Sequence, residues 1–252
     1  MKKAILAVML VACGSCDVVE KFNDNCTASS STVGTSSVDL DVRKRTVRSQ
    51  EAPVGNLVAD AIFTAAADPQ VVAAIQNSGG IRPERCAGGE RDTIAAGILT
   101  EADVEDLLPF ENYLTIVTVT GAQLKSVLER SVSALPEETE GWFLQVSKLS
   151  FTADCTLQRQ VLSVDETAIV TDGARVTSVM IAGTALSLTA SYRIVTNDYV
   201  ASGEDGFLAM RSATSTPTAV LYTDALEAHL AAASPVAPAI EGRITLTGCA
   251  PP

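Results

Sequence analysis

Histidine is almost absent from this chain, which has 252 residues and a single imidazole, His229. That count excludes any metal centre or catalytic constellation that needs several imidazoles. Basic residues are also few, with 18 Lys and Arg against 30 Asp and Glu, for a formal net charge of -12. Proteins that bind nucleic acids need clustered positive charge to contact phosphates, so the composition excludes this class of partner.

Two common sequence signatures are missing as well. The chain contains neither the G-x-x-x-x-G-K-[ST] phosphate loop nor the G-x-S-x-G turn that exposes a nucleophilic serine. Carboxylates are plentiful, but without geometry a pair of them identifies no glycosidase site. We therefore expect no catalytic residue, no metal site and no cofactor in this chain.

Long apolar runs are scarce too, and the run that opens the chain is short. Ala4 to Ala12 follows Lys2 and Lys3 and has nine residues. Nine residues of helix span about 14 Å, less than half of a bilayer core of about 30 Å, so the run fits a secretory signal better than a membrane span. Its end, Leu10-Val11-Ala12-Cys13, resembles a bacterial lipobox, in which the cysteine is lipidated after cleavage.

This pattern predicts a signal peptide over residues 1–12, a lipid anchor on Cys13 and an extracytoplasmic, lipid-anchored location in the cell envelope. A plain signal peptide, a buried strand that ends in cysteine, and cleavage before Cys16 remain alternatives. Residues 13–37 are rich in Ser and Thr and lack apolar periodicity, so we expect a tether there and a folded domain over residues 38–249.

Six cysteines are present: Cys13, Cys16, Cys26, Cys86, Cys155 and Cys249. If Cys13 carries lipid, five thiols remain in an oxidising compartment, and two disulfides with one free thiol is the simplest arrangement. Sequence does not determine the connectivity. A Cys26–Cys249 pair, which would join the two ends of the domain, is one possibility.

The chain as a whole has the composition of a globular protein, with 47% hydrophobic and 19% charged residues. Apolar spacing and turn residues predict helices over 53–67, 100–108, 122–132 and 223–233, strands over 71–75, 113–120, 144–153, 192–196 and 242–246, and a hairpin over 175–188. Because helices and strands interleave without a regular βαβ rhythm, we predict a single α+β domain with a mixed sheet.

Polar residues and glycines gather where predicted strands end. Asn77-Ser78-Gly79-Gly80-Ile81-Arg82 follows one buried strand, and Leu108-Pro109-Phe110 places an aromatic ring between a helix and a strand. The stretch from Asn197 through Tyr199 to Asp205-Gly206-Phe207 repeats the pattern. Loops at strand ends are common places for binding residues, so these three segments are the candidate site.

The three segments, with residues 51–60 and Phe143-Leu144-Gln145-Val146, resemble the C-terminal substrate-binding domain of 5'-nucleotidases and UDP-sugar hydrolases. Five motifs occur in the family's order, although Ser78 replaces a glycine. The resemblance implies a nucleobase stacked between Phe110 and Tyr199, with Asn77 on the base edge and Asp205 on the ribose hydroxyls. It also implies Arg48 and Arg82 on the phosphate or ribose side of the ligand, beside Gly79 and Gly80.

Each residue also has a structural interpretation. Phe110 and Tyr199 are core or edge aromatics, Asn77 caps a turn, Asp205 closes an Asx turn, and Arg82 pairs with Glu84 or Asp103 on the surface. We interpret the segments Gly55-Asn56 and Phe143 to Val146 as parts of the framework of the fold and not of the binding site. The ordered set of motifs favours the binding site.

The resemblance also implies a function in extracytoplasmic nucleotide catabolism, as a domain that binds a nucleoside or nucleotide. Complete family members carry a metallophosphoesterase domain with a dimetal site, and this chain lacks the histidines for one. Two alternatives remain open. In the first, the chain is a subunit that completes a nucleotidase together with a separate metallophosphoesterase. In the second, it is a surface lipoprotein that uses the fold for protein contacts.

Overall fold

The structure is a computed structural model that describes residues 29–84 and 89–249. The expected signal peptide and Cys13, Cys16, Cys26 and Cys86 lie outside the described residues. The helices are α1 (Lys44–Val47), α2 (Pro53–Ala65), α3 (Glu101–Leu107), α4 (Gly121–Ser131), α5 (Asp198–Ala201) and α6 (Tyr222–Ala233), with 3-10 turns η1 (Ser78–Gly80), η2 (Glu204–Gly206) and η3 (Leu208–Ser212).

Fifteen strands are described. They are β1 (Thr32–Ser36), β2 (Leu40–Asp41), β3 (Val71–Asn77), β4 (Thr93–Ile94), β5 (Gly97–Thr100), β6 (Tyr113–Thr120), β7 (Leu144–Ser147), β8 (Leu149–Asp154), β9 (Val161–Leu162), β10 (Ile169–Thr171), β11 (Val176–Ile181), β12 (Thr184–Ala185), β13 (Ser191–Asn197), β14 (Thr214–Leu221) and β15 (Ile244–Thr247).

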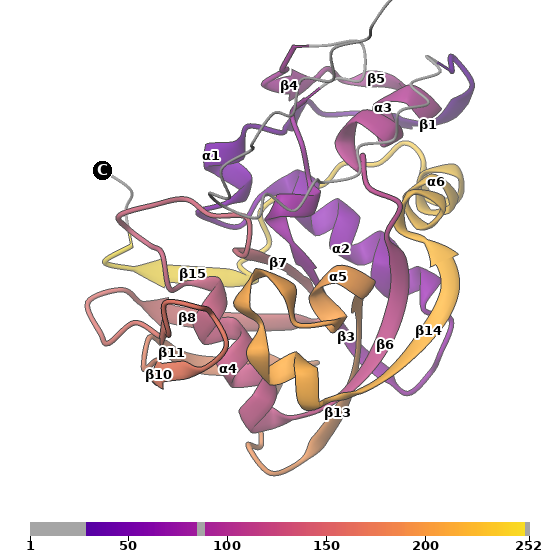
Figure 1. Cartoon of the computed structure of the whole chain (residues 1–252). Helices are drawn as coiled ribbons and strands as arrows, with labels where there is room; N and C mark the ends of the chain where they lie inside the picture. The colour runs from indigo at the N-terminus through magenta and orange to yellow at the C-terminus, as the bar shows by residue number, and fades with distance from the viewer. Residues whose placement is uncertain (1–28, 85–88, 250–252) are drawn as a thin grey trace, which may run out of the picture.

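A five-stranded sheet in the order β14-β6-β13-β3-β7 forms the centre of the fold. In this sheet β13 runs parallel to β3, and every other neighbouring pair is antiparallel. A second sheet, β12-β11-β8-β15, lies on the left in Figure 1 and also contains one parallel pair, β15 with β8. Both sheets are therefore mixed, which confirms the predicted α+β fold.

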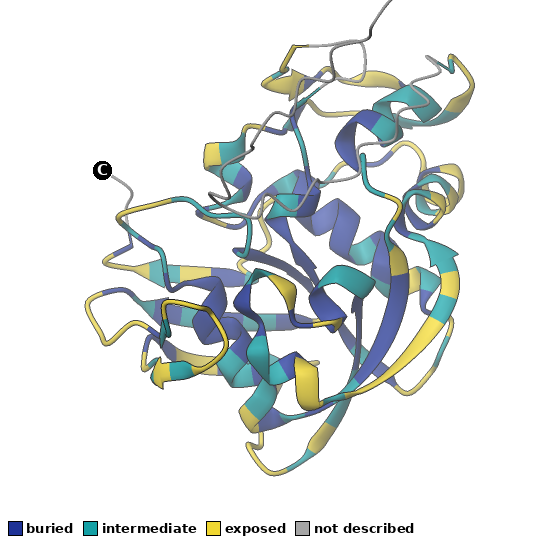
Figure 2. Cartoon of the chain, viewed as in Figure 1, coloured by how far each residue is buried: buried dark blue, intermediate teal, exposed yellow. Residues whose placement is uncertain are grey.

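The central sheet separates two apolar cores. Successive side chains of a strand point to opposite faces, and along β3 Ala74 packs with α2 and α6 whereas Ile75 packs in the second core. The first core takes Val58 from α2 and Leu226 from α6. The second takes apolar residues of α4 together with residues of the second sheet. Figure 2 shows the inner strands as buried and β14, at the sheet edge, as largely exposed.

Three expectations need correction, and one strand was not predicted. The predicted tether, residues 13–37, ends too late, because Thr32–Ser36 pairs with β5 as strand β1 and the folded region begins before residue 38. The predicted strand over 144–153 is two strands, because Lys148 has a φ of 57° and turns the chain from β7 into β8. The sequence does not predict strand β14, since Pro217 lies within it, which an edge strand tolerates. The second arm of the predicted 175–188 hairpin is short, Thr184–Ala185.

The described disulfide joins Cys155 to Cys249. Cys249 therefore does not pair with Cys26, which corrects that possibility. The reason lies in strand pairing, because β15 runs parallel to β8 and Thr247 stands opposite Asp154. Each cysteine follows the end of its strand by one or two residues, so the two sulfurs meet.

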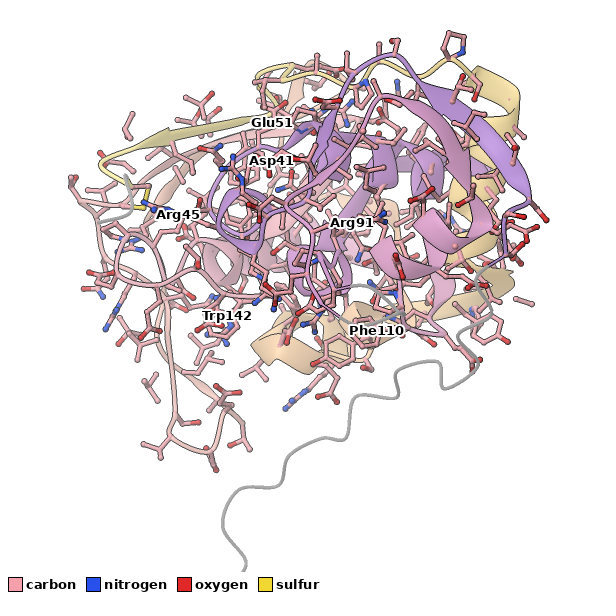
Figure 3. The ribbon with its side chains drawn as sticks, turned by 90° about the horizontal axis from the view of Figure 1, so that it is seen from above. Asp41, Arg45, Glu51, Arg91, Phe110 and Trp142 are labelled. Carbon is pink, nitrogen blue, oxygen red and sulfur yellow. A yellow bond between two sulfur atoms is a disulfide. The ribbon has the colours of Figure 1, made fainter. Side chains whose placement is uncertain are left out.

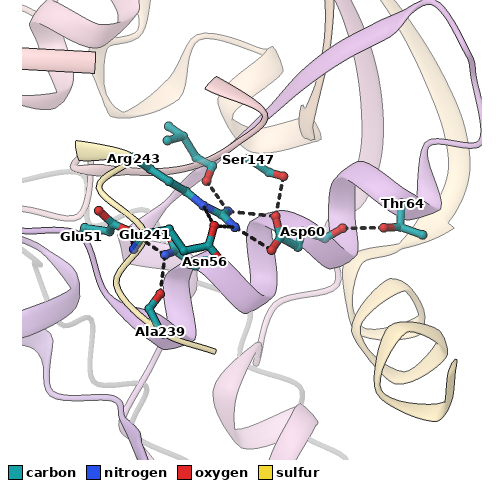
Figure 4. Close-up of polar contacts among 9 residues, drawn as sticks. Glu51, Asn56, Asp60, Thr64, Ser147, Ala239, Glu241 and Arg243 are labelled. Atoms are coloured by element: carbon teal, nitrogen blue, oxygen red, sulfur yellow. Dashed lines mark hydrogen bonds and ion pairs between the residues drawn. The ribbon is translucent and has the colours of Figure 1, made fainter. Parts of the chain in front are cut away.

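Polar side chains of the 51–60 motif fasten the C-terminal strand to α2 (Figure 4). The buried carboxylate of Glu51 accepts hydrogen bonds from Asn56 Nδ2 at 2.7 Å and from the backbone N–H groups of Glu241 at 2.6 Å and Ile244 at 3.2 Å. The Asp60 carboxylate accepts one hydrogen bond from each terminal nitrogen of Arg243, both at 2.8 Å. The polar residues of this motif thus serve architecture, in agreement with the interpretation of Gly55-Asn56.

We expect Glu51→Gln to lower the free energy of unfolding by about 2–3 kcal/mol, because an amide in place of one carboxylate oxygen leaves a buried N–H without an acceptor. Urea denaturation measures the change. Glu241→Gln is the matched control. The Glu241 side chain is exposed, and Arg243, its partner, keeps two bonds to Asp60, so we expect a change below about 1 kcal/mol. Equal stability of the two variants would contradict this account.

Candidate functional site

Four chain segments meet at one edge of the central sheet because of strand direction. The parallel strands β3 and β13 end there, at Asn77 and Asn197. The antiparallel neighbours β6 and β7 begin at the same edge, since Leu114 stands opposite Asn197 and Leu144 opposite Asn77. The segments that directly precede β6 and β7 therefore border the same place, and they contain Phe110 and Trp142 respectively.

Three buried amides form the floor of this edge. The side-chain oxygen of Asn77 accepts from Asn197 Nδ2 at 2.9 Å and from Gln76 Nε2 at 3.1 Å, and Asn197 Nδ2 also donates to Gln76 Oε1 at 3.1 Å. Asn197 Oδ1 accepts from the N–H of Val200 and so caps the start of α5. The oxygen of Asn77 thus accepts two hydrogen bonds, and its Nδ2 group is left to donate elsewhere.

Asp205 lies beside the Nδ2 group of Asn77. Its Oδ2 accepts from Asn77 Nδ2 at 3.1 Å and its Oδ1 accepts from the hydroxyl of Tyr199 at 3.1 Å. Asp205 has φ 55° and ψ 17°, in the left-handed region, and the flanking Gly203 and Gly206 also have positive φ, of 86° and 77°. The glycines of Gly203-Glu204-Asp205-Gly206 are therefore required by the turn that carries the carboxylate.

The structure thus brings together three predicted residues, Asn77, Tyr199 and Asp205. Asp205 is partly buried, and burial raises its pKa above the usual value of 3.8, although Asn77, Tyr199 and two nearby arginines favour the ionised form. An ionised carboxylate has about four acceptor positions, of which two are used here. The remaining positions suit a ligand with neighbouring hydroxyl groups.

Phe110 and Arg82 form a second part of the site. The Arg82 guanidinium lies over the Phe110 ring, 5.1 Å from its centroid, and also approaches Glu84 at 4.0 Å. The backbone N–H of Phe110 donates to the hydroxyl of the buried Tyr222 at 3.0 Å, which fixes the segment before β6. The ion pair with Glu84 agrees with one structural interpretation of Arg82, whereas Asp103 pairs with Arg91 instead.

Arg48 lies close enough to Arg82 and Asp205 for their charges to act on it. Burial, followed by the nearby positive charge of Arg82, lowers the pKa of the Arg48 guanidinium. Among the described residues no acceptor bonds its buried Nε. Arg43, five residues before Arg48, forms an ion pair with Asp41.

The loop that carries Arg48 is held by Gln145, from the Phe143-Leu144-Gln145-Val146 motif. Gln145 Nε2 donates to the carbonyls of Val47 and Gln50, each at 2.8 Å, and its Oε1 accepts from the N–H of Ala52 at 3.1 Å. Gly55 leaves the space for this side chain, because a Cβ there would lie 2.4 Å from Gln145. The two motifs therefore interlock as architecture, as expected.

Gly79 and Gly80 form the η1 turn directly after Asn77. The N–H of Gly79 donates to Gly141 O at 2.7 Å, and a Cβ on Gly79 would lie 3.1 Å from the Cα of Gly141. A Cβ on Gly80 would lie 2.5 Å from Gln76 Nε2. Both glycines thus make room for neighbouring protein groups at the border of the site.

Sequence reasoning missed Arg130 and Trp142. Arg130 Nε donates to the backbone oxygen of Asp205 at 2.8 Å, and its guanidinium lies 3.9 Å from the centre of the Trp142 ring system. Figure 3 shows Trp142 and Phe110 along the same side of the molecule. A single arginine near the end of a helix does not indicate a binding role in the sequence. The one feature that could have pointed to this part of the site is that Trp142 is the only tryptophan of the chain.

Neither a cluster of metal ligands nor a membrane-spanning helix occurs in the part of the chain that the structure describes. Within residues 29–84 and 89–249, no three His, Cys, Asp or Glu side chains are grouped as metal ligands. The same part of the chain has no helix with the length and apolar character needed to cross a bilayer.

Comparison with known proteins gives consistent matches. The family model described as 5'-nucleotidase, C-terminal domain matches residues 32–212. Trifunctional nucleotide phosphoesterase protein YfkN from Bacillus subtilis (strain 168) is 31% identical over 220 residues, which are 84% of this chain and 14% of that protein. Protein 5NUC from Lutzomyia longipalpis is 30% identical over 232 residues, 86% of this chain and 38% of that protein.

Among solved structures, the 5'-nucleotidase precursor from Thermus thermophilus has a TM-score of 0.73 at 28% identity, over 87% of this chain and 40% of that one. This chain therefore spans well under half the length of these relatives. The span matched by the family model runs from β1 to the end of η3 and contains all the predicted binding residues. The chain belongs to the family of 5'-nucleotidase C-terminal domains.

Proposed function

We propose that this chain binds a nucleoside or nucleotide at the edge of the central sheet, with the base stacked between Phe110 and Tyr199. The observation that carries the proposal is the carboxylate of Asp205, which Asn77 and Tyr199 hold while two acceptor positions stay open. A ribose offers two adjacent hydroxyl donors that match those positions.

In this proposal, Asn77 and Tyr199, which lie beside Asp205, recognise the base. Asn77 Nδ2 uses one hydrogen on Asp205 and has a second for an acceptor on the base edge. Aromatic rings stack on any base, and such stacking contributes about 1–3 kcal/mol per base. The Tyr199 hydroxyl links the ring to the ribose acceptor, a contact that phenylalanine in its place would lack.

In this proposal, Arg48 and Arg82 bind the phosphate of a nucleotide. The pKa of Arg48 is lowered, because its burial and the positive charge of Arg82 outweigh the nearby carboxylates of Glu140, Glu84 and Asp205. A bound anion would offset this unfavourable charge. The planar arginine fork suits phosphate oxygens. This electrostatic arrangement supports a nucleoside monophosphate as well as a nucleoside among the ligands.

Hydrolysis, in this proposal, belongs to a dimetal metallophosphoesterase outside these residues, because the chain's one histidine cannot build such a site. We place the chain in extracytoplasmic nucleotide catabolism, anchored in the cell envelope by lipid on Cys13. A role in which the fold serves only protein contacts is the outcome if no nucleoside binds.

We expect adenosine and AMP to bind the full chain in calorimetric titrations without added metal, and Phe110→Ala or Tyr199→Ala to weaken binding roughly 5- to 150-fold, the equivalent of about 1–3 kcal/mol of stacking. Phe63→Ala is the matched control, because Phe63 is a half-buried ring on α2 outside the site. No binding by the unaltered chain, or equal affinity in all four proteins, would refute the proposal.

Acidification should release the ligand before the fold is lost. Ribose hydroxyls donate to the ionised Asp205, whose pKa lies above 3.8, so we expect affinity for uridine to fall as pH drops through that raised pKa. Protonation itself favours the folded state here, because a carboxyl with a raised folded-state pKa contributes stability that is lost as pH rises.

Titrations with uridine between pH 7 and pH 4, with near-ultraviolet circular dichroism as the check on folding, measure this dependence. Asp205→Asn should bind weakly at every pH, with a flat profile. An unaltered affinity of the original chain across this range would contradict the assignment of Asp205 to the ribose.

A further inference from the structure

We propose that Arg130 is a positioning residue of this site, whose guanidinium, stacked on Trp142, fixes the backbone of Asp205 and so aims the carboxylate that receives the ribose. The inference rests on the proposed function and adds to it a residue on α4, outside the family motifs on which the site was predicted.

The contacts of Arg130 are those of a buried clamp. Its side chain is 9% exposed, its Nε donates to Asp205 O at 2.8 Å, and its guanidinium covers Trp142 at 3.9 Å. A Cβ on Gly206 would lie 2.8 Å from Nε and 3.0 Å from Cζ of Arg130. The turn after Asp205 therefore packs directly on the guanidinium, at a position where only glycine fits.

Asp205 needs such a clamp because its turn is intrinsically loose. Gly203, Asp205 and Gly206 all have positive φ, and glycine loses more conformational freedom on ordering than any other residue. Asn77 and Tyr199 hold the carboxylate, but the backbone oxygen of Asp205 is held by Arg130. Without the bond from Arg130, the turn would adopt several backbone conformations. The Asp205 carboxylate would keep its bonds to Asn77 and Tyr199 in only some of them.

Arg130 is itself held mainly by Trp142. Glu166, from the β9–β10 hairpin, approaches Arg130 Nη2 at 3.9 Å, but its side chain is 61% exposed, so this ion pair contributes little. The indole face offers a desolvated cation–π contact, the stronger kind of interaction. Trp142 lies just before β7, so the clamp joins α4, the start of β7 and the Asp205 turn.

The experiment compares uridine with 2′,3′-dideoxyuridine, which lacks the hydroxyls assigned to Asp205, by calorimetric titration of the full chain. We expect the original chain to bind uridine at least ten-fold more tightly than the dideoxy compound. In Arg130→Met the ratio of the two affinities should fall below three, while the affinity for dideoxyuridine changes less than three-fold, since the stacking rings are untouched. A residue that supports only the fold would lower both affinities together.

Arg130→Lys is the second variant and decides the question if Arg130→Met does not fold by circular dichroism. It keeps the charge but has no N–H at the Nε position, so most of the discrimination between the two ligands should again be lost. Arg175→Met is the matched control. Arg175 is 4% exposed and donates to the carbonyls of Val132 and Leu135 near the end of α4, without contacting Asp205. We expect it to lower stability and to keep the ratio.

The outcomes separate the two proposals. If the original chain binds neither compound, or binds both equally, the proposed function fails and the inference fails with it. If the original chain discriminates and Asp205→Asn does not, the function stands. An undiminished ratio in the folded arginine variants then overturns the positioning role alone.

Discussion

Two strands that are more than a hundred residues apart in sequence, β3 and β13, lie parallel in the centre of the main sheet and end side by side. Parallel strands share a carboxyl edge, and in mixed α and β proteins that edge is a common place for ligands. Here it brings the side chains of Asn77 and Asn197 within 2.9 Å of one another, and it sets where the Asp205 turn can reach the sheet. The group formed by Asn77, Tyr199 and Asp205 depends on this pairing.

The polar residues of the motifs divide into two kinds. Asn77, Tyr199 and Asp205 bond one another at the sheet edge and leave donors and acceptors open. Glu51 and Gln145 are buried, and their side chains form hydrogen bonds with backbone atoms of other segments. The second kind holds in place the Arg48 loop and the segment that leads into β15, so a motif can be characteristic of a family without touching a ligand.

Much of this arrangement was predictable from the sequence, for physical reasons. Helical apolar spacing located α2, α4 and α6, and β-branched runs located β3, β6 and β13, because these elements bury one or both faces. The Cys155–Cys249 pair and strand β1 were not predictable, since both depend on pairing between distant segments. Arg130 was missed for the same reason: its role comes from the Asp205 turn that packs on it, 75 residues further along the chain.

A crystal structure of the chain with bound uridine would show whether a nucleoside occupies the sheet edge between Phe110 and Tyr199. We expect the uracil ring between those two side chains and the ribose hydroxyls on the carboxylate of Asp205. Uridine bound elsewhere on the molecule, or bound at this edge with its ribose away from Asp205, would contradict it.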